Sequence, residues 1–133
     1  MTQTMKENID DILEEVMAKD AHVLCREVMS ITDTMDVLRA KWTVEVLTAI
    51  VCGNTRFKDI QEAAHGVSEK VLTERLRQMQ EDKLIERHEC YGYPPRVEYL
   101  VTEHGKRLFV IAYRMTEWGQ EHRQLILDLP AGK

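Results

Sequence analysis

The stretch between residues 68 and 82 carries side chains whose types and spacing suit contact with nucleic acid. At about 100° per residue, its apolar side chains share one side of a helix: Leu72, Leu76 and Met79. Its polar side chains share the opposite side: Lys70, Thr73, Glu74 and Arg77. Arginine can donate two hydrogen bonds to one guanine, and threonine can offer its methyl group to thymine. We therefore expect Lys70, Thr73 and Arg77 to approach DNA, with Lys70 on a phosphate because it lies nearer the helix start.

Three further residues of this stretch need separate interpretation: Ser68, Glu74 and Arg75. Ser68 is expected to cap the helix and to lie near a phosphate, because backbone N–H groups at a helix start bind anions. Glu74 would repel phosphate, so it either accepts a hydrogen bond from a cytosine amino group or is steered away by Arg77. Arg75 falls beside the apolar stripe, where it could pair with an acidic neighbour or with a backbone phosphate. Taken alone, an amphipathic helix of this kind more often exposes its polar side to solvent without binding a ligand.

A second cationic candidate, Arg96, ends a loop that contains Gly92, Pro94 and Pro95. Glycine and proline keep residues 91–96 from being helical, so we predict a hairpin of strands 84–90 and 97–101 around this loop. The two prolines stiffen the loop and reduce the entropy that Arg96 loses on binding. We expect Arg96 to reach the minor groove or the phosphates; the alternative is a surface pair with Glu98.

Cysteines can form disulfides, bind metals or be oxidised. This chain has three of them, an odd number at wide spacing: Cys25, Cys52 and Cys90. This spacing argues against a disulfide scaffold, and no Cys or His pair has zinc-ligand spacing, so no metal site is expected. His22 and Arg26 would favour the thiolate of Cys25, whereas Glu27 opposes it. Cys25 is therefore either redox-active or a small buried apolar residue. Cys52 is expected in the core and Cys90 to be inert.

The composition describes a single small domain. The chain has 133 residues and a formal net charge of -5; residues 1–54 hold 5 Lys and Arg against 10 Asp and Glu, whereas residues 55–114 hold 11 against 10. It shows no apolar run long enough to span a membrane and no basic signal peptide, so a cytoplasmic location is expected. Serine occurs only at Ser30 and Ser68, the histidines are dispersed, and no phosphate-binding loop is present. We expect neither enzymatic activity nor a cofactor.

The elements that must position these residues follow from periodicity and turn residues. We predict helices at residues 9–17, from about 32, at 41–51, 58–64 and 68–82, and from about 102 onward, with an edge strand at 55–57 and the hairpin above. The 41–51 helix is apolar enough to be central. Thr102 and Gly105 are expected to open the last helix. A short helix pair followed by a hairpin is the winged helix-turn-helix arrangement, so the fold class is α+β and mainly helical.

Four segments resemble the HxlR family of bacterial, MarR-like transcription regulators. They are Lys41-Trp42-Thr43, Arg56-Phe57-Lys58-Asp59-Ile60, the run 67–77, and Pro94-Pro95-Arg96-Val97-Glu98-Tyr99 with Thr102 and Gly105. The resemblance covers residues 32–122 in order and spacing. It implies a winged-helix homodimer that binds double-stranded DNA at pseudo-palindromic operators. It also implies that residues 1–24 and 102–133 form the dimer and that residues 25–101 bind DNA.

Apolar residues at helical spacing near the N-terminus agree with such a dimer: Ile9, Ile12, Leu13 and Val16. A small-molecule effector between the dimer helices and the winged domain is a further conceivable partner, although no residue indicates its identity. The main alternative function is a winged-helix protein-interaction module that does not bind DNA.

Two positions depart from the family pattern. Arg39 and Ala40 stand where the family usually has two glycines, which predicts a more continuous junction between helices. Met29 stands where many members have their N-terminal cysteine, and Cys25 lies four residues earlier. Redox sensing in relatives therefore does not transfer directly to Cys25.

Overall fold

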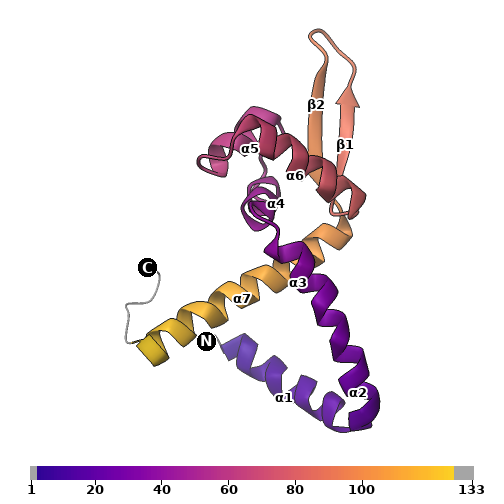
Figure 1. Cartoon of the computed structure of the whole chain (residues 1–133), viewed down its shortest axis with the longest axis vertical. Helices are drawn as coiled ribbons and strands as arrows, with labels where there is room; N and C mark the ends of the chain where they lie inside the picture. The colour runs from indigo at the N-terminus through magenta and orange to yellow at the C-terminus, as the bar shows by residue number, and fades with distance from the viewer. Residues whose placement is uncertain (1–2, 128–133) are drawn as a thin grey trace. The chain divides into compact units, whose positions relative to one another are not determined.

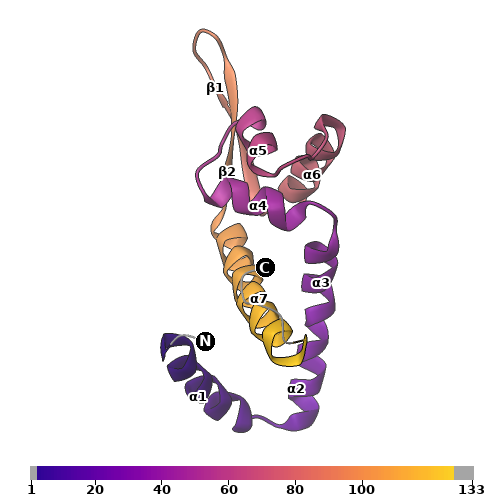
Figure 2. The same ribbon diagram turned by 90° about the vertical axis from the view of Figure 1, so that its left-hand side faces the viewer.

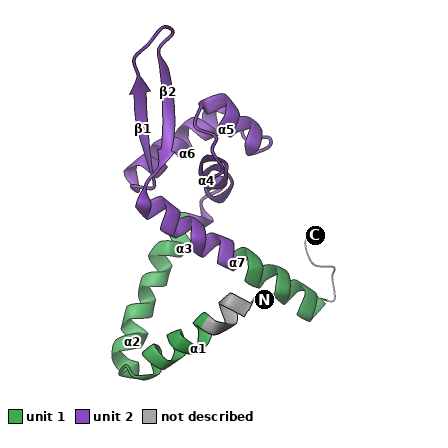
Figure 3. Cartoon of the chain, turned by 180° about the vertical axis from the view of Figure 1, so that it is seen from behind, with its two compact units in different colours: residues 1–37, 116–133 green, residues 38–115 purple. Residues whose placement is uncertain are grey.

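The computed structural model describes residues 3–127, with side chains from residue 8 onward. The chain forms two compact units (Figure 3): Leu38–Met115 is one, and Met1–Val37 with Thr116–Lys133 is the other. Within the described residues, no helix has both the length and the apolar character that spanning a membrane requires.

The Leu38–Met115 unit is built around three helices, α4 (Thr43–Val51), α5 (Phe57–Ala63) and α6 (Glu69–Glu81) (Figure 1). Their apolar faces form one core with the residues that enter the hairpin: Val46, Leu47, Ile50, Ile60, Leu72, Leu76, Met79, Leu84 and Ile85. The central apolar helix predicted at 41–51 is confirmed from Thr43 onward. The prediction of a mainly helical winged helix-turn-helix fold is confirmed as well.

The hairpin consists of β1 (Ile85–Cys90) and β2 (Arg96–Val101), paired antiparallel from Ile85 opposite Val101 to Cys90 opposite Arg96. Its base lies in the core at Ile85, whereas most of β1 beyond it is exposed. Figure 2 shows the hairpin extending beyond α4, α5 and α6 of the same unit. The predicted edge strand at 55–57 is wrong: Phe57 already begins α5, and a 2.8 Å bond from the Tyr99 N–H to the Thr55 carbonyl links this segment to β2.

The last helix, α7 (Glu103–Leu127), begins against the base of the hairpin. The Thr102 hydroxyl oxygen accepts from the Gly105 N–H at 3.0 Å, which confirms that these two residues open the helix. The backbone N–H of Thr102 donates to the Leu84 carbonyl at 3.0 Å. The start of α7 is therefore fixed to the residue just before β1.

The other unit contains α1 (Gln3–Met17), α2 (Ala21–Glu27), the short 3-10 helix η1 (Val28–Ser30) and α3 (Ile31–Arg39) up to Val37, with the end of α7. The sequence did not predict α2, which Asp20 caps by accepting from the His22 N–H at 2.7 Å. None of the described residues of this unit is buried. Met35 on α3 is 40% exposed. The described part of this unit thus has no buried core within one chain.

The junction between α3 and α4 is not continuous, so that prediction is wrong. Helix α3 ends at Arg39, and α4 begins at Thr43 after Trp42, whose φ is 74°. A left-handed φ at a residue other than glycine costs roughly 1–2 kcal/mol. The break between the two helices is therefore made at Trp42, a residue type that gives no such signal in the sequence.

Candidate nucleic-acid interface

The helix pair α5 and α6 is joined by a tight turn that two left-handed residues create. His65 and Gly66 have φ values of 50° and 91°. The Gln61 amide donates to the Val67 carbonyl at 3.2 Å and closes the turn from inside the helix pair. At its end, the Ser68 hydroxyl accepts from the Val71 N–H at 3.2 Å. The prediction that Ser68 caps α6 is confirmed.

Helix α6 has the two faces expected of a recognition helix. Leu72, Leu76 and Met79 are at most 1% exposed, which confirms the apolar back. Arg75 is half-buried beside them, as its position next to the apolar stripe predicts. Lys70 and Thr73 are exposed and line an open hollow of about 730 Å³ with Glu69 and Glu74. The polar side of α6 is thus free of contacts with its own core.

Four exposed residues follow one another along α6 at a spacing of three or four, and we call them the charged row: Lys70, Glu74, Arg77 and Glu81. Their charges alternate, so the row has no formal net charge. Thr73 lies beside it, and its hydroxyl donates to the Glu69 carbonyl at 2.8 Å. Because this bond occupies the hydroxyl proton, the methyl group is the part of Thr73 best suited to an apolar contact.

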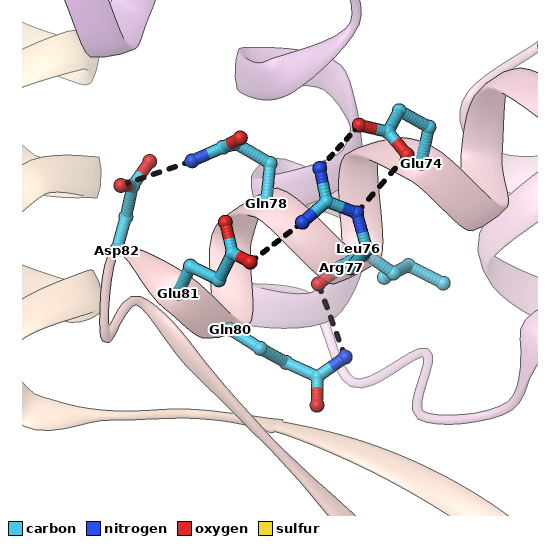
Figure 4. Close-up of polar contacts among 7 residues, drawn as sticks. All are labelled: Glu74, Leu76, Arg77, Gln78, Gln80, Glu81 and Asp82. Carbon is cyan, nitrogen blue, oxygen red and sulfur yellow. Dashed lines mark hydrogen bonds and ion pairs between the residues drawn. The ribbon is translucent and has the colours of Figure 1, made fainter.

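Arg77 is held between two carboxylates (Figure 4). Its Nε and Nη2 donate to the two oxygens of Glu74 at 3.1 and 2.5 Å, and its Nη1 donates to Glu81 Oε1 at 2.6 Å. The hydrogen bonds from Arg77 lower the pKa of the Glu74 carboxyl, and the bonds to Glu74 raise the pKa of Arg77. Both groups therefore stay ionised at neutral pH. Glu81 is a partner of Arg77 that was not predicted, although its spacing of four residues from Arg77 is a recognisable signal.

The hairpin carries charged residues that are also paired. Arg96 Nε lies 3.2 Å from Glu98 Oε1, so the alternative pair weighed for Arg96 is present, while 52% of the Arg96 side chain stays exposed. Arg87 Nη1 donates to Glu89 Oε1 at 2.9 Å, a bond that raises the pKa of Arg87.

The tip of the hairpin presents two aromatic rings to solvent. Tyr91 and Tyr93 are 92% and 103% exposed. A tyrosine at such a position either covers the hairpin or contacts a ligand such as a sugar. Their full exposure shows that they do not cover it.

The thiols lie elsewhere than expected. Cys52 was predicted in the core but is exposed, because it follows the last turn of α4, where Gly53 turns the chain with a φ of 107°. Cys25 is exposed on α2, so its interpretation as a small buried residue is wrong. Cys90 is half-buried at the end of β1. Redox activity of Cys25 stays a prediction.

Comparisons with known proteins agree with this geometry. The HxlR-like helix-turn-helix family model matches residues 37–126. The HTH-type transcriptional regulator YybR of Bacillus subtilis is 31% identical over 93 residues, which are 70% of this chain and 74% of YybR. An HTH-type transcriptional regulator of Methanothermobacter thermautotrophicus is 33% identical over 101 residues, covering 76% of this chain and 74% of that protein. The structure of a MarR-family transcriptional regulator from Enterococcus faecalis V583 matches with a TM-score of 0.70 at 29% identity, over 85% of this chain and 97% of that one.

Proposed function

The chain belongs to the HxlR-like helix-turn-helix family and is a transcriptional regulator with a helix-turn-helix DNA-binding domain, and we propose that it binds a pseudo-palindromic operator as a homodimer. The observation that carries DNA binding is α6, a helix with a buried apolar back and an exposed polar side. It follows α5 through a tight turn and precedes a projecting hairpin, the order found in DNA-reading winged helices. As a regulator that binds the chromosome, it would act in the cytoplasm.

The terminal helices support the dimer. Many apolar side chains of these terminal segments are exposed: Ile12, Leu13, Met17, Val23, Trp118, Leu125, Ile126 and Leu127. Large apolar side chains left in water in such number are typical of protein interaction sites, and a two-fold partner would cover the same side chains on both chains. We assign dimerisation to residues 1–24 and 102–133, and DNA binding to residues 25–101.

Within the DNA-binding region we assign contacts by position. Lys70 and Ser68, in the first turn of α6 and at its cap, would meet phosphates, because helix N-termini and cations favour anions. Thr73 would contact a thymine methyl group. Arg75, half-buried at the edge of the apolar face, would reach a backbone phosphate. A small-molecule effector stays a prediction.

The test of this function is selection of bound fragments from random DNA by the purified protein. We expect enrichment of an inverted repeat whose half-sites lie about one helical turn, or roughly 34 Å, apart, because two recognition helices of a dimer enter successive major grooves. Absence of DNA binding at low salt would contradict the proposal and favour the protein-interaction module.

The wing gives a second prediction. Arg96→Ala should weaken binding to operator and random DNA alike and make the slope of log affinity against log salt shallower by about one, because one phosphate contact is lost. Lys19→Ala removes the same charge from the other unit and serves as the control. Unchanged affinity of Arg96→Ala for both DNAs would leave Arg96 with only its Glu98 pair.

A further inference from the structure

The charged row of α6 poses a problem for a DNA-reading helix, because a carboxylate stands in its middle. Glu74 lies one turn after Lys70 and one turn before Arg77, with both oxygens bonded to the Arg77 guanidinium. We propose that Glu74 and Arg77 read one C·G base pair together, with Glu74 accepting from the cytosine amino group and Arg77 donating to the guanine. This inference rests on the proposed function.

The hydrogen-bonding capacity left on the pair supports this reading. A guanidinium has five N–H donors, and Arg77 uses three of them on Glu74 and Glu81. Each oxygen of the Glu74 carboxylate accepts one bond from Arg77 and keeps a second lone pair. The pair therefore offers acceptors and two remaining donors side by side on an exposed helix face.

This pattern complements a C·G pair better than an A·T pair. In the major groove, guanine presents two neighbouring acceptors, N7 and O6, and cytosine presents the N4 amino donor. Adenine places its N6 amino donor next to N7, so the second donor of an arginine would meet a donor there. Carboxylates pair with cytosine N4 and arginine with guanine, and the Glu74–Arg77 pair supplies both groups at once.

Electrostatics explains why the two residues would have to act together. A lone carboxylate between two rows of phosphates is repelled, whereas Arg77 offsets the charge of Glu74, and together with Lys70 and Glu81 the charged row has no formal net charge. Glu81 accepts from the Nη1 of Arg77 at 2.6 Å and holds the far side of the guanidinium. We regard Glu81 as a positioning residue. The alternative is an ordinary solvated ion pair, which contributes little to stability and nothing to base recognition.

The experiment compares the wild-type chain with Glu74→Ala, Arg77→Ala and the double variant on the selected operator and on operators with each base pair replaced. For the wild type we expect a preference of about tenfold or more for one C·G pair in each half-site. Each single variant should lose the preference at that same base pair. The double variant should lose no more than either single variant, because the two side chains act as a unit.

Glu89→Ala is the matched control, since Glu89 is an exposed carboxylate that also accepts from an arginine, Arg87, but lies on β1 rather than α6, so this variant should leave the C·G preference intact. If Arg77→Ala removes the preference while Glu74→Ala keeps it, arginine reads alone and the inference is wrong. Loss of preference at two different base pairs, or at none, overturns it too. Failure of the wild type to select any DNA contradicts the proposed function itself and is seen before any variant is made.

Discussion

Replacing Gly105 by alanine should destabilise the Leu38–Met115 unit by roughly 2–4 kcal/mol, because a methyl group has no space at this position. Gly105 is buried at the start of α7. A β-carbon built there would overlap the Leu84 carbonyl oxygen and lie 2.9 Å from Val101 Cγ2. These atoms belong to the residue before β1 and to the end of β2, so the overlap falls at the base of the hairpin.

The surrounding hydrogen bonds prevent an easy adjustment. The Leu84 carbonyl accepts from the Thr102 N–H at 3.0 Å and from the Thr102 hydroxyl at 3.1 Å. Moving this carbonyl away from a new methyl group would break bonds that fix the start of α7. The loss of stability therefore reflects crowding rather than an unusual backbone conformation.

Thermal or denaturant unfolding of Gly105→Ala measures the effect. Gly119→Ala in the same helix is the matched control, because a β-carbon at Gly119 would meet no described atom beyond its own helical turn within 4 Å. Alanine is favoured over glycine inside a helix by about 0.5–1 kcal/mol, so the control should gain stability. Equal stability of Gly105→Ala and the wild type would show that the base of the hairpin can open without cost.

The elements that bury an apolar face could be predicted from the sequence. The predicted helix at 68–82 agrees with α6 because its apolar residues repeat at helical spacing and Ser68 can cap it. The hairpin was predictable because Pro94, Pro95 and Gly92 interrupt two extended stretches. In both cases the structure requires particular residue types, apolar residues for burial and glycine or proline for the turn, and these can be recognised in the sequence.

The elements that the sequence did not reveal lack such a requirement. Helix α2 begins at the local cap formed by Asp20 and has no buried residue. Because it packs no apolar face into a core, burial does not require apolar residues to repeat at helical spacing in its sequence. The helix break at Trp42 depends on a φ that its residue type does not favour. In the candidate interface, Arg77 was predicted to face DNA, but its bonds to Glu74 and Glu81 depend on side-chain conformations that spacing alone does not determine.

Replacing Ile12 and Leu13 by aspartate should convert the proposed homodimer into a monomer and weaken operator binding by about a hundredfold or more. The two side chains are 55% and 49% exposed on α1 in a single chain, in a unit with no buried residue among those described. A partner would cover them, and a charge placed there would have to be desolvated on association. The loss in DNA affinity follows because linked half-site contacts strengthen binding by roughly 10²–10⁴ over one contact.

Light scattering measures the mass, and titration of a fluorescent operator measures the affinity. Asp11→Ala with Glu14→Ala changes two exposed residues on the opposite, acidic side of α1 and should keep the dimer mass. A single half-site separates the two effects, because the monomeric variant should bind it with the affinity of one intact winged domain. A dimer mass for Ile12→Asp with Leu13→Asp at micromolar concentration would place the two-fold contact elsewhere in the chain.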